Sequence, residues 1–363
     1  MADPEEPPEP IITASTTHEG EPPNERLRRN RFPPVDALRG VRRRHPLGWF
    51  VARRLATAVV LIVVVSMLVF VATSILPGDA VTRILGRFAT TESLATLRQQ
   101  LGLDEPAPER YLTWFGNLVT GDLGMSATTT QTPVWELVKG RFGNTLILAF
   151  IAMVFMLPLS IGLGTWAGIR AGRRADRVVS GITLGFIALP DFVVGAVLIL
   201  VFAIWFGLLP PISLVAPGES PLADPTVLVL PIATILISVL AYTIRMVRAG
   251  VIEVMESEYV QMARLNGIPE SRVVLKHALR NALAPSVQVI ALTFQWLVGG
   301  VLIVETLFGY PGIGLGLVQA VQQRDITYVQ SVATLIAAFY ILINIASDVV
   351  VVLLVPKLRT AAQ

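Results

Sequence analysis

Residues 258–285 read EYVQMARLNGIPESRVVLKHALRNALAP, a polar, helix-forming segment between two long apolar runs. The chain of 363 residues is 53% hydrophobic and only 15% charged, which is too apolar for a soluble domain of this length. Its apolar residues fall into six runs of roughly 20 to 30, and at about 1.5 Å per residue each run can cross a hydrocarbon core of about 30 Å. The sequence therefore predicts an all-α membrane protein with six transmembrane helices.

The expected membrane spans set the boundaries of the rest of the chain. They cover residues 49–76, 144–169, 178–209, 226–247, 284–308 and 329–355. The third is long and interrupted by Pro190, which indicates a tilt or a kink. Residues 77–143 carry both charge signs, Pro and Gly breaks and an amphipathic helical piece near 92–101, so we expect a small soluble domain between the first two spans. Residues 144–360 form the expected core.

The N-terminal region has two parts that differ in charge. Residues 1–25 are rich in Pro and Glu, and this composition predicts a disordered tail. Residues 26–48 are rich in arginine. An arm that binds nucleic acid would have this charge, but arginines directly before a span more often fix its orientation and contact anionic lipid. The first apolar run starts too late and is too long for a cleaved signal peptide.

The distribution of Lys and Arg predicts the topology. When the segments are assigned to alternate sides, one side has 10, 4, 6 and 2 of these residues, and the other has 6, 0 and 1. Because cytoplasmic loops carry the excess of positive charge, both termini and residues 258–285 are expected in the cytoplasm. The 77–143 domain is then extracytoplasmic.

Motifs for a nucleotide, a cofactor or a metal are missing from the sequence. No GxxxxGK[ST] motif occurs. The glycine-rich run FGYPGIGLGL at 308–317 follows a span and lacks the strand and helix of a dinucleotide site. There is no cysteine, and the three histidines, His18, His45 and His277, are scattered. The chain is therefore not expected to be an enzyme, and any transport must draw on partner subunits or on an ion gradient.

Ionisable residues in or beside the apolar runs are candidates for a translocation path, because such groups are costly in a bilayer and usually turn inward. Asp191 follows Pro190 in the third span and either lines a path or bonds to another helix. Glu305 lies near the outer end of the fifth span, where an ion pair or a helix cap is the alternative. Asp348 and Asn344 form a polar pair that favours helix packing.

The cytoplasmic segment is predicted to present an apolar stripe to a partner. Residues 253–266 contain no Pro or Gly, and Tyr259, Met262, Ala263 and Asn266 have helical spacing. Gly267 is expected to end this helix, and Pro269 is expected to open a second one that reaches residue 285. The alternative is a surface helix that packs on its own bundle or on lipid.

The same segment carries a family resemblance. It resembles the cytoplasmic loop of permeases from binding-protein-dependent ABC importers. The general motif, Glu-Ala-Ala with a downstream Gly, is matched only at Ala263 and Gly267. The form found in the dipeptide and oligopeptide branch fits better, with Glu258-Tyr259, Ala263-Arg264, Gly267, HALRNA at 277–282 and Pro285.

Further matches to this branch occur in family order over about residues 48–360. They are WFVARRL at 49–55, LPGD at 76–79, LRQQLGLDEP at 97–106, GDLG at 121–124, Asn144-Thr145, Pro190 with Phe192, VET at 304–306, Pro311-Gly312 with Gly314, Arg324-Asp325, and Asn344 with Asp348. The sequence departs from the branch at Asn266, where Lys is usual, at Pro269, at Val355 and in its long N-terminal tail. The first two departures, at Asn266 and Pro269, are expected to alter how tightly a particular ATPase is bound.

The resemblance implies a type I ABC importer permease fold in the bacterial cytoplasmic membrane. The implied partners are a second permease, two cytoplasmic ATPases that bind ATP and Mg, and an extracytoplasmic binding protein. The chain itself would hold no cofactor. Contacts with the ATPases would come from Glu258, Tyr259, Met262, Ala263, Arg264 and Gly267, and the candidate path residues are Pro190, Asp191, Phe192 and Glu305.

The substrate class implied by the resemblance is peptides, moved by alternating access. A nickel chelate, glutathione or another small solute is the alternative within the same importer type. A gradient-driven secondary transporter is the alternative from another class, although the sequence shows few ionisable groups at mid-span and no inverted repeat.

Overall fold

The computed structural model describes residues 46–75, 90–92, 96, 105–126, 132–216, 218–274, 293 and 301–354. Several sequence predictions lie outside these ranges. They concern the tail at 1–25, most of the basic segment 26–48, most of the helical piece 92–101, the motif residues 277–285 and most of the fifth span.

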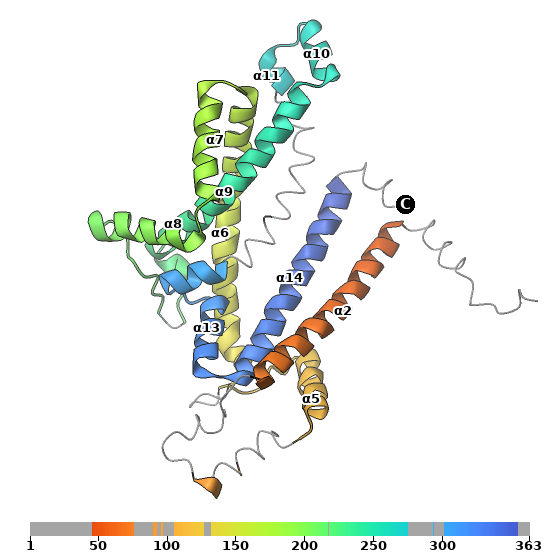
Figure 1. Ribbon diagram of the computed structural model, residues 1–363, viewed down its shortest axis with the longest axis vertical. Coiled ribbons are helices and arrows are strands. Elements are labelled where there is room, and N and C mark those ends of the chain that lie inside the picture. The colour runs from red at the N-terminus through yellow and green to blue at the C-terminus, as the bar shows by residue number, and fades with distance from the viewer. Residues whose placement is uncertain are drawn as a thin grey trace, which may run out of the picture.

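The described part of the chain is helical, as predicted for this fold class, and its one β-bridge joins Met125 and Pro133. Its labelled helices are α2 (Pro46–Ile75), α5 (Ala107–Thr120), α6 (Val134–Ile169), α7 (Arg174–Ile187), α8 (Asp191–Leu198), α9 (Thr226–Met255), α10 (Glu258–Leu265), α11 (Glu270–Arg272), α13 (Ile313–Gln323) and α14 (Ile326–Leu354). In Figure 1, α10 and α11 lie at one end of the molecule and α5 lies at the other.

Four helices are long and apolar enough to cross a membrane: α2, α6, α9 and α14. Two bent pairs bring the number to six if each pair is one span. The first pair is α7 with α8 and its π-helical continuation Ile199–Trp205, bent by 105°, and the second is Val301–Phe308 with α13, bent by 72°. The predicted six spans therefore depend on how these two pairs are counted.

The first bend lies where Pro190 was expected to interrupt the third span. Proline lacks the N–H for a helical hydrogen bond and disfavours helix in the residue before it. Accordingly, α7 ends at Ile187, before Pro190, and α8 begins at Asp191, directly after it. The change of direction is far larger than a tilt, and α8 projects sideways from α7 in Figure 1.

Two helices extend beyond the expected membrane spans. α6 begins at Val134, ten residues before the expected start of the second span, so the end of the predicted 77–143 domain is part of a long helix. α9 continues to Met255, eight residues beyond the expected end. The glycine-rich run at 308–317 enters helix α13 at Ile313.

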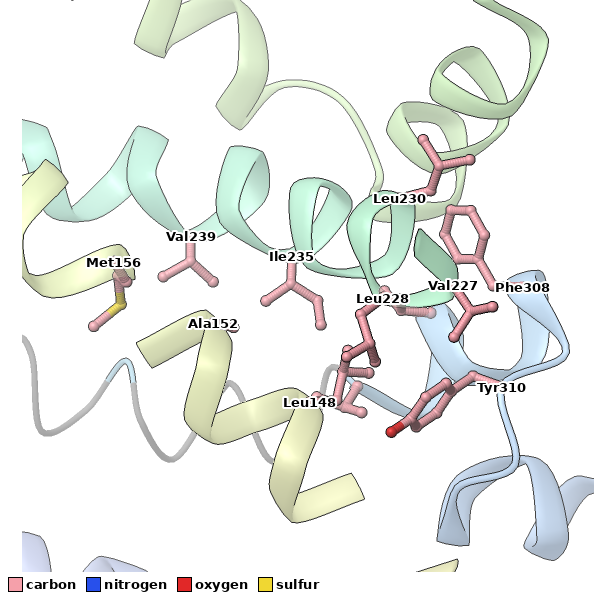
Figure 2. Packing of buried hydrophobic residues seen from close by; sticks show 12 residues of the cluster. Leu148, Ala152, Met156, Val227, Leu228, Leu230, Ile235, Val239, Phe308 and Tyr310 are labelled. Atoms are coloured by element: carbon pink, nitrogen blue, oxygen red, sulfur yellow. The ribbon is translucent and has the colours of Figure 1, made fainter. Parts of the chain in front are cut away.

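The main core lies between α6 and α9, and Figure 2 shows side chains from both helices meeting there. Phe308, the last residue of the helix Val301–Phe308, and Tyr310, in the turn before α13, close one end of this core and are fully buried. The two helix backbones approach closely because α6 has glycine at the contact. A Cβ at Gly164 would lie 2.7 Å from Val247 Cβ, and one at Gly168 would lie 2.8 Å from Val251 Cβ.

α2 packs along α14, and the two helices lie side by side in Figure 1. Arg54 near the start of α2 pairs with Asp348 at 2.8 Å. Nearer the other end of α2, Gln330 donates a buried 2.7 Å hydrogen bond to the hydroxyl of Thr73. Asp348 therefore joins two helices, which is the packing role favoured from the sequence.

Candidate functional site

The predicted coupling segment lies at the end of α9, where the chain turns sharply into α10. The sequence indicated one helix over 253–266, but the structure breaks it at Glu256 and Ser257. The Ser257 hydroxyl donates to the carbonyl of Val254 at 2.5 Å, and the Ser257 carbonyl accepts from the amides of Val260 and Gln261. A serine that satisfies backbone groups on both sides supports a turn without Gly or Pro.

One face of α10 packs against its own chain. Val260 and Ala263 are buried against Val273, with Val254, Met255 and Ile268 around them. Ala263 was assigned to the stripe that meets a partner, but its side chain lies in this cluster rather than on the exposed face of α10. We call the unit 256–274 the hairpin.

The opposite face of α10 exposes three large apolar side chains. Tyr259 is 42% exposed, Met262 60% and Leu265 81%. Asn266 and Glu258 are exposed beside them. Exposed apolar residues on a short helix at the end of the molecule are typical of a docking surface.

The turn after α10 is held by glycine geometry and an ion pair. Gly267 has φ +74°, which is left-handed and favours glycine, and its amide bonds to the carbonyl of Arg264 at 2.9 Å. Arg264 donates to both carboxylate oxygens of Glu270, at 2.7 and 3.1 Å. These hydrogen bonds lower the pKa of Glu270 and raise the pKa of Arg264. Arg264, predicted to contact an ATPase, thus braces the hairpin.

The second candidate region is a cavity of about 410 Å³ beside the Pro190 bend. Asp191 lines it together with Ser238 and Tyr242 from α9, Thr293, and apolar side chains at the end of α7. Of the other path candidates, Pro190 and Phe192 are exposed next to it. Ser238 and Tyr242 were not singled out from the sequence, although two polar residues one turn apart within an apolar run gave a signal.

Glu305 faces a different part of the molecule. Its side chain is fully buried and accepts hydrogen bonds from the Thr145 hydroxyl at 2.5 Å and from the amides of Gly314 and Leu315 at 2.7 and 3.3 Å. Thr145 in turn accepts from the amide of Ile313 at 2.9 Å. The carboxylate therefore caps the N-terminus of α13, which is the cap considered from the sequence.

A buried ion pair that sequence reading missed joins α7 to α9. Asp176 is 3% exposed. Its carboxylate accepts hydrogen bonds from Nε and Nη2 of Arg248, at 2.5 and 2.8 Å, and from the amide of Gly172 at 2.9 Å. Asp176 lies in the first turn of α7, and nothing in the local pattern indicates a partner 72 residues away.

The described residues contain no group of three or more His, Cys, Asp and Glu that could hold a metal ion. They contain an exposed apolar face on α10, a partly polar cavity beside Pro190, and the long helix α9 between the two.

Comparison with known families agrees with this arrangement. Residues 160–360 match the family described as the binding-protein-dependent transport system inner membrane component. Residues 47–149 match the N-terminal region of the same kind of membrane component. The chain belongs to this family of transport permeases.

Curated relatives match over most of their length. The chain is 31% identical over 313 residues to a protein of Sinorhizobium fredii named "Probable peptide ABC transporter permease protein", covering 86% of this chain and all of the relative. It is 35% identical over 310 residues to the glutathione transport system permease protein GsiC of Escherichia coli, covering 85% of this chain and 98% of the relative.

Membership in this family confirms the predictions for the type of subunit and for the kinds of partner. The chain is a multi-pass permease subunit of an inner-membrane ABC importer, and it is not the ATPase. A component of this kind works with a binding protein and with ABC partner subunits.

Proposed function

We propose that this chain is one of two permeases in an importer that moves short peptides into the cytoplasm, with both of its termini on the cytoplasmic side. The two relatives described above are named for peptides and for glutathione, which is itself a tripeptide. The orientation is supported by the excess of Lys and Arg on the side of the termini. Residues 77–143 then face outward, where a binding protein delivers its substrate.

The observation that carries the proposal is the division of α10 into two faces. The inner face, with Val260 and Ala263, is fixed to the end of α9, and the outer face, with Tyr259 and Met262, is exposed. We assign Glu258, Tyr259, Met262 and Leu265 to contact with a cytoplasmic ATPase. Arg264 and Gly267 hold the hairpin rigid behind that contact.

α9 provides the mechanical connection. The helix is continuous from Thr226 to Met255, and Tyr242 in the cavity is about 20 Å from Met255 at about 1.5 Å per residue. Gly164 and Gly168 on α6 and the pair Asp176–Arg248 on α7 hold the same stretch of α9. A displacement of the hairpin is therefore transmitted to the cavity by a group of helices that moves together.

The cavity beside Pro190 is the part of the structure that best suits a translocation path. Asp191 offers a carboxylate to the α-amino group of a peptide, and Ser238 and Tyr242 offer hydroxyls. Phe192 lies exposed one residue further on. Glu305 faces the amides at the start of α13, so we assign it a positioning role in which it fixes the turn at the end of the main core.

A matched pair of variants tests the docking face. Met262→Arg places a charge in the exposed apolar face, whereas Gln261→Arg places the same charge one residue away among exposed polar groups. We expect Met262→Arg to weaken ATPase association by about 10-fold or more, since an apolar anchor at an interface is worth about 1–2 kcal/mol or more, and to abolish ATP-driven peptide uptake in proteoliposomes.

Gln261→Arg should retain most of the uptake. Equal uptake by the two variants would contradict the assignment of the face. Uptake that collapses with the proton gradient and persists without ATP would contradict the importer reading and favour a gradient-driven transporter.

A further inference from the structure

Helix α5 divides into three sectors along its length. Tyr111, Trp114, Phe115 and Leu118 share one sector and are half-buried against the protein. Leu112 and Val119, seven residues apart, share a second sector and are 67% and 71% exposed. The third sector is polar and exposed, with Glu109, Thr113, Asn117 and Thr120.

The protein-facing sector contacts α2 well inside its membrane-spanning length. Phe70 of α2 packs edge-on against Tyr111, with ring centroids 5.4 Å apart, and stacks on Trp114 at 6.1 Å. The Tyr111 hydroxyl lies 2.9 Å from the hydroxyl of Ser66. Along the α2 axis Phe70 is about 7 Å from the end at Ile75, and Ser66 is about 13 Å from it, at about 1.5 Å per residue.

Because α2 is a candidate membrane span, a helix that packs on its Ser66 and Phe70 is expected at the membrane boundary rather than in open water. The apolar half of a bilayer is about 15 Å thick, so a helix whose side chains reach Ser66 lies at or below the headgroup level. The rings of Tyr111 and Trp114 contact each other, and the half-exposed Trp135 at the start of α6 lines the same cavity as Phe115 of α5. Aromatic residues of this kind are typical of the membrane boundary.

α2, on which α5 packs, also exposes apolar side chains. α2 is a candidate membrane span, and beside Ser66 and Phe70 it exposes Val64, Met67, Leu68 and Val71 by 42 to 63%. Beneath α5 lies an apolar cavity of about 290 Å³, lined by Phe115, Leu118 and Val119 of α5, Ile62 of α2 and Leu335 of α14. An acyl chain that follows α2 would fill it.

We propose that α5 is an interfacial helix embedded in the outer leaflet, with Leu112 and Val119 in contact with phospholipid and an acyl chain in the cavity behind Val119. Its polar sector faces water, as in amphipathic helices that lie in the plane of a membrane. The expected soluble domain at 77–143 is thus attached to the membrane surface at this helix. The embedding depends on α2 being a span, and only the choice of leaflet rests on the proposed orientation.

The absence of cysteine from the chain allows a direct test. Single cysteines at Leu112 and Val119, and control cysteines at Thr113 and Asn117, are labelled with a nitroxide in the complete importer, assembled with cysteine-free partner subunits in liposomes. The labels at 112 and 119 should relax several-fold more with oxygen, which concentrates in lipid, than with a water-soluble nickel complex. The labels at 113 and 117 should show the reverse preference.

Two results would overturn the proposal. Access of the nickel complex to all four labels would place α5 in water. Labels at 112 and 119 that neither reagent reaches would show that a partner subunit, rather than lipid, covers this sector. Peptide uptake by the same variants is measured in parallel, so a failure of the transport assignment is read independently of the position of α5.

Discussion

Gly164 shows how one atom decides whether α6 and α9 pack. A methyl group at this position would meet Val247 and the carbonyl of Ile244, whereas one at Gly162, two residues earlier, would meet nothing within 4 Å. The two glycines look alike in the sequence, and only the structure separates the one in contact from the one facing away.

Alanine substitution at these two glycines should therefore have opposite effects. We expect Gly164→Ala to destabilise the permease by about 1–3 kcal/mol, because the helices cannot move apart without opening the main core. Gly162→Ala should be neutral or stabilising by up to about 1 kcal/mol through helix propensity. Thermal unfolding of the two purified variants in detergent measures this difference, and equal melting temperatures would argue against the contact.

At the scale of elements, the hairpin combines an apolar cluster with an exposed ion pair. The pKa of Glu270 is lowered in the folded hairpin by the two hydrogen bonds from Arg264. A carboxyl with a lowered folded pKa stabilises the fold above its ordinary value of 4.5, and this contribution is lost as the pH falls through the folded pKa.

Acidification should consequently loosen the hairpin by a small amount. Both partners are largely exposed, so the effect should stay below about 1 kcal/mol and diminish in salt. Hydrogen exchange of the amides at 264–268 should report weaker protection below about pH 4.5 after correction for intrinsic rates. Glu270→Gln should remove this pH dependence, and a variant that keeps it would assign the effect to another group.

The sequence predicted some elements well and others poorly, for physical reasons. Pro190 and Gly267 act through their own backbone restrictions, and both mark breaks in the structure. The break at Ser257 has no such residue, since it depends on Val260 packing back onto Val254 and Met255. Spacing correctly indicated that α10 has an apolar stripe, but it did not show that Ala263 faces inward.

The same limit applied to long-range polar contacts. The sequence offered a helix cap as one role for Glu305. It did not identify the donors, which are the amides of Gly314 and Leu315 in the first turn of α13. It gave no partner for Asp176, because Arg248 comes from a different helix. Such pairs depend on tertiary approach rather than on local pattern.

At the scale of the whole molecule, a substitution in the cavity should change ATP hydrolysis by a partner bound at the hairpin. We expect Asp191→Asn to weaken uptake of peptides with a free N-terminus by about 10-fold or more, since a hydrogen bond to a charged group is worth about 1.5–3 kcal/mol. Peptide-stimulated ATP hydrolysis by the assembled importer should fall with it. N-acetylated peptides should be affected little.

Glu219→Gln is the matched control, because Glu219 is an exposed carboxylate in the loop before α9 and does not line the cavity. Both variants are compared by uptake and by ATP hydrolysis in the same liposomes. Equal losses for free and acetylated peptides would remove the role assigned to the Asp191 carboxylate.

The joint between α9 and α10 has a consequence for how such transporters diversify. No glycine, proline or buried charge fixes its angle, because the cluster around Val260 and Val273 does so by side-chain volume. Exchanging valine for a larger or smaller residue there would tilt the surface that carries Tyr259 and Met262 without altering any atom on it. If the ATPase docks on this face as we propose, such mutations would re-aim the permease at a differently shaped ATPase without changing the residues in contact with it.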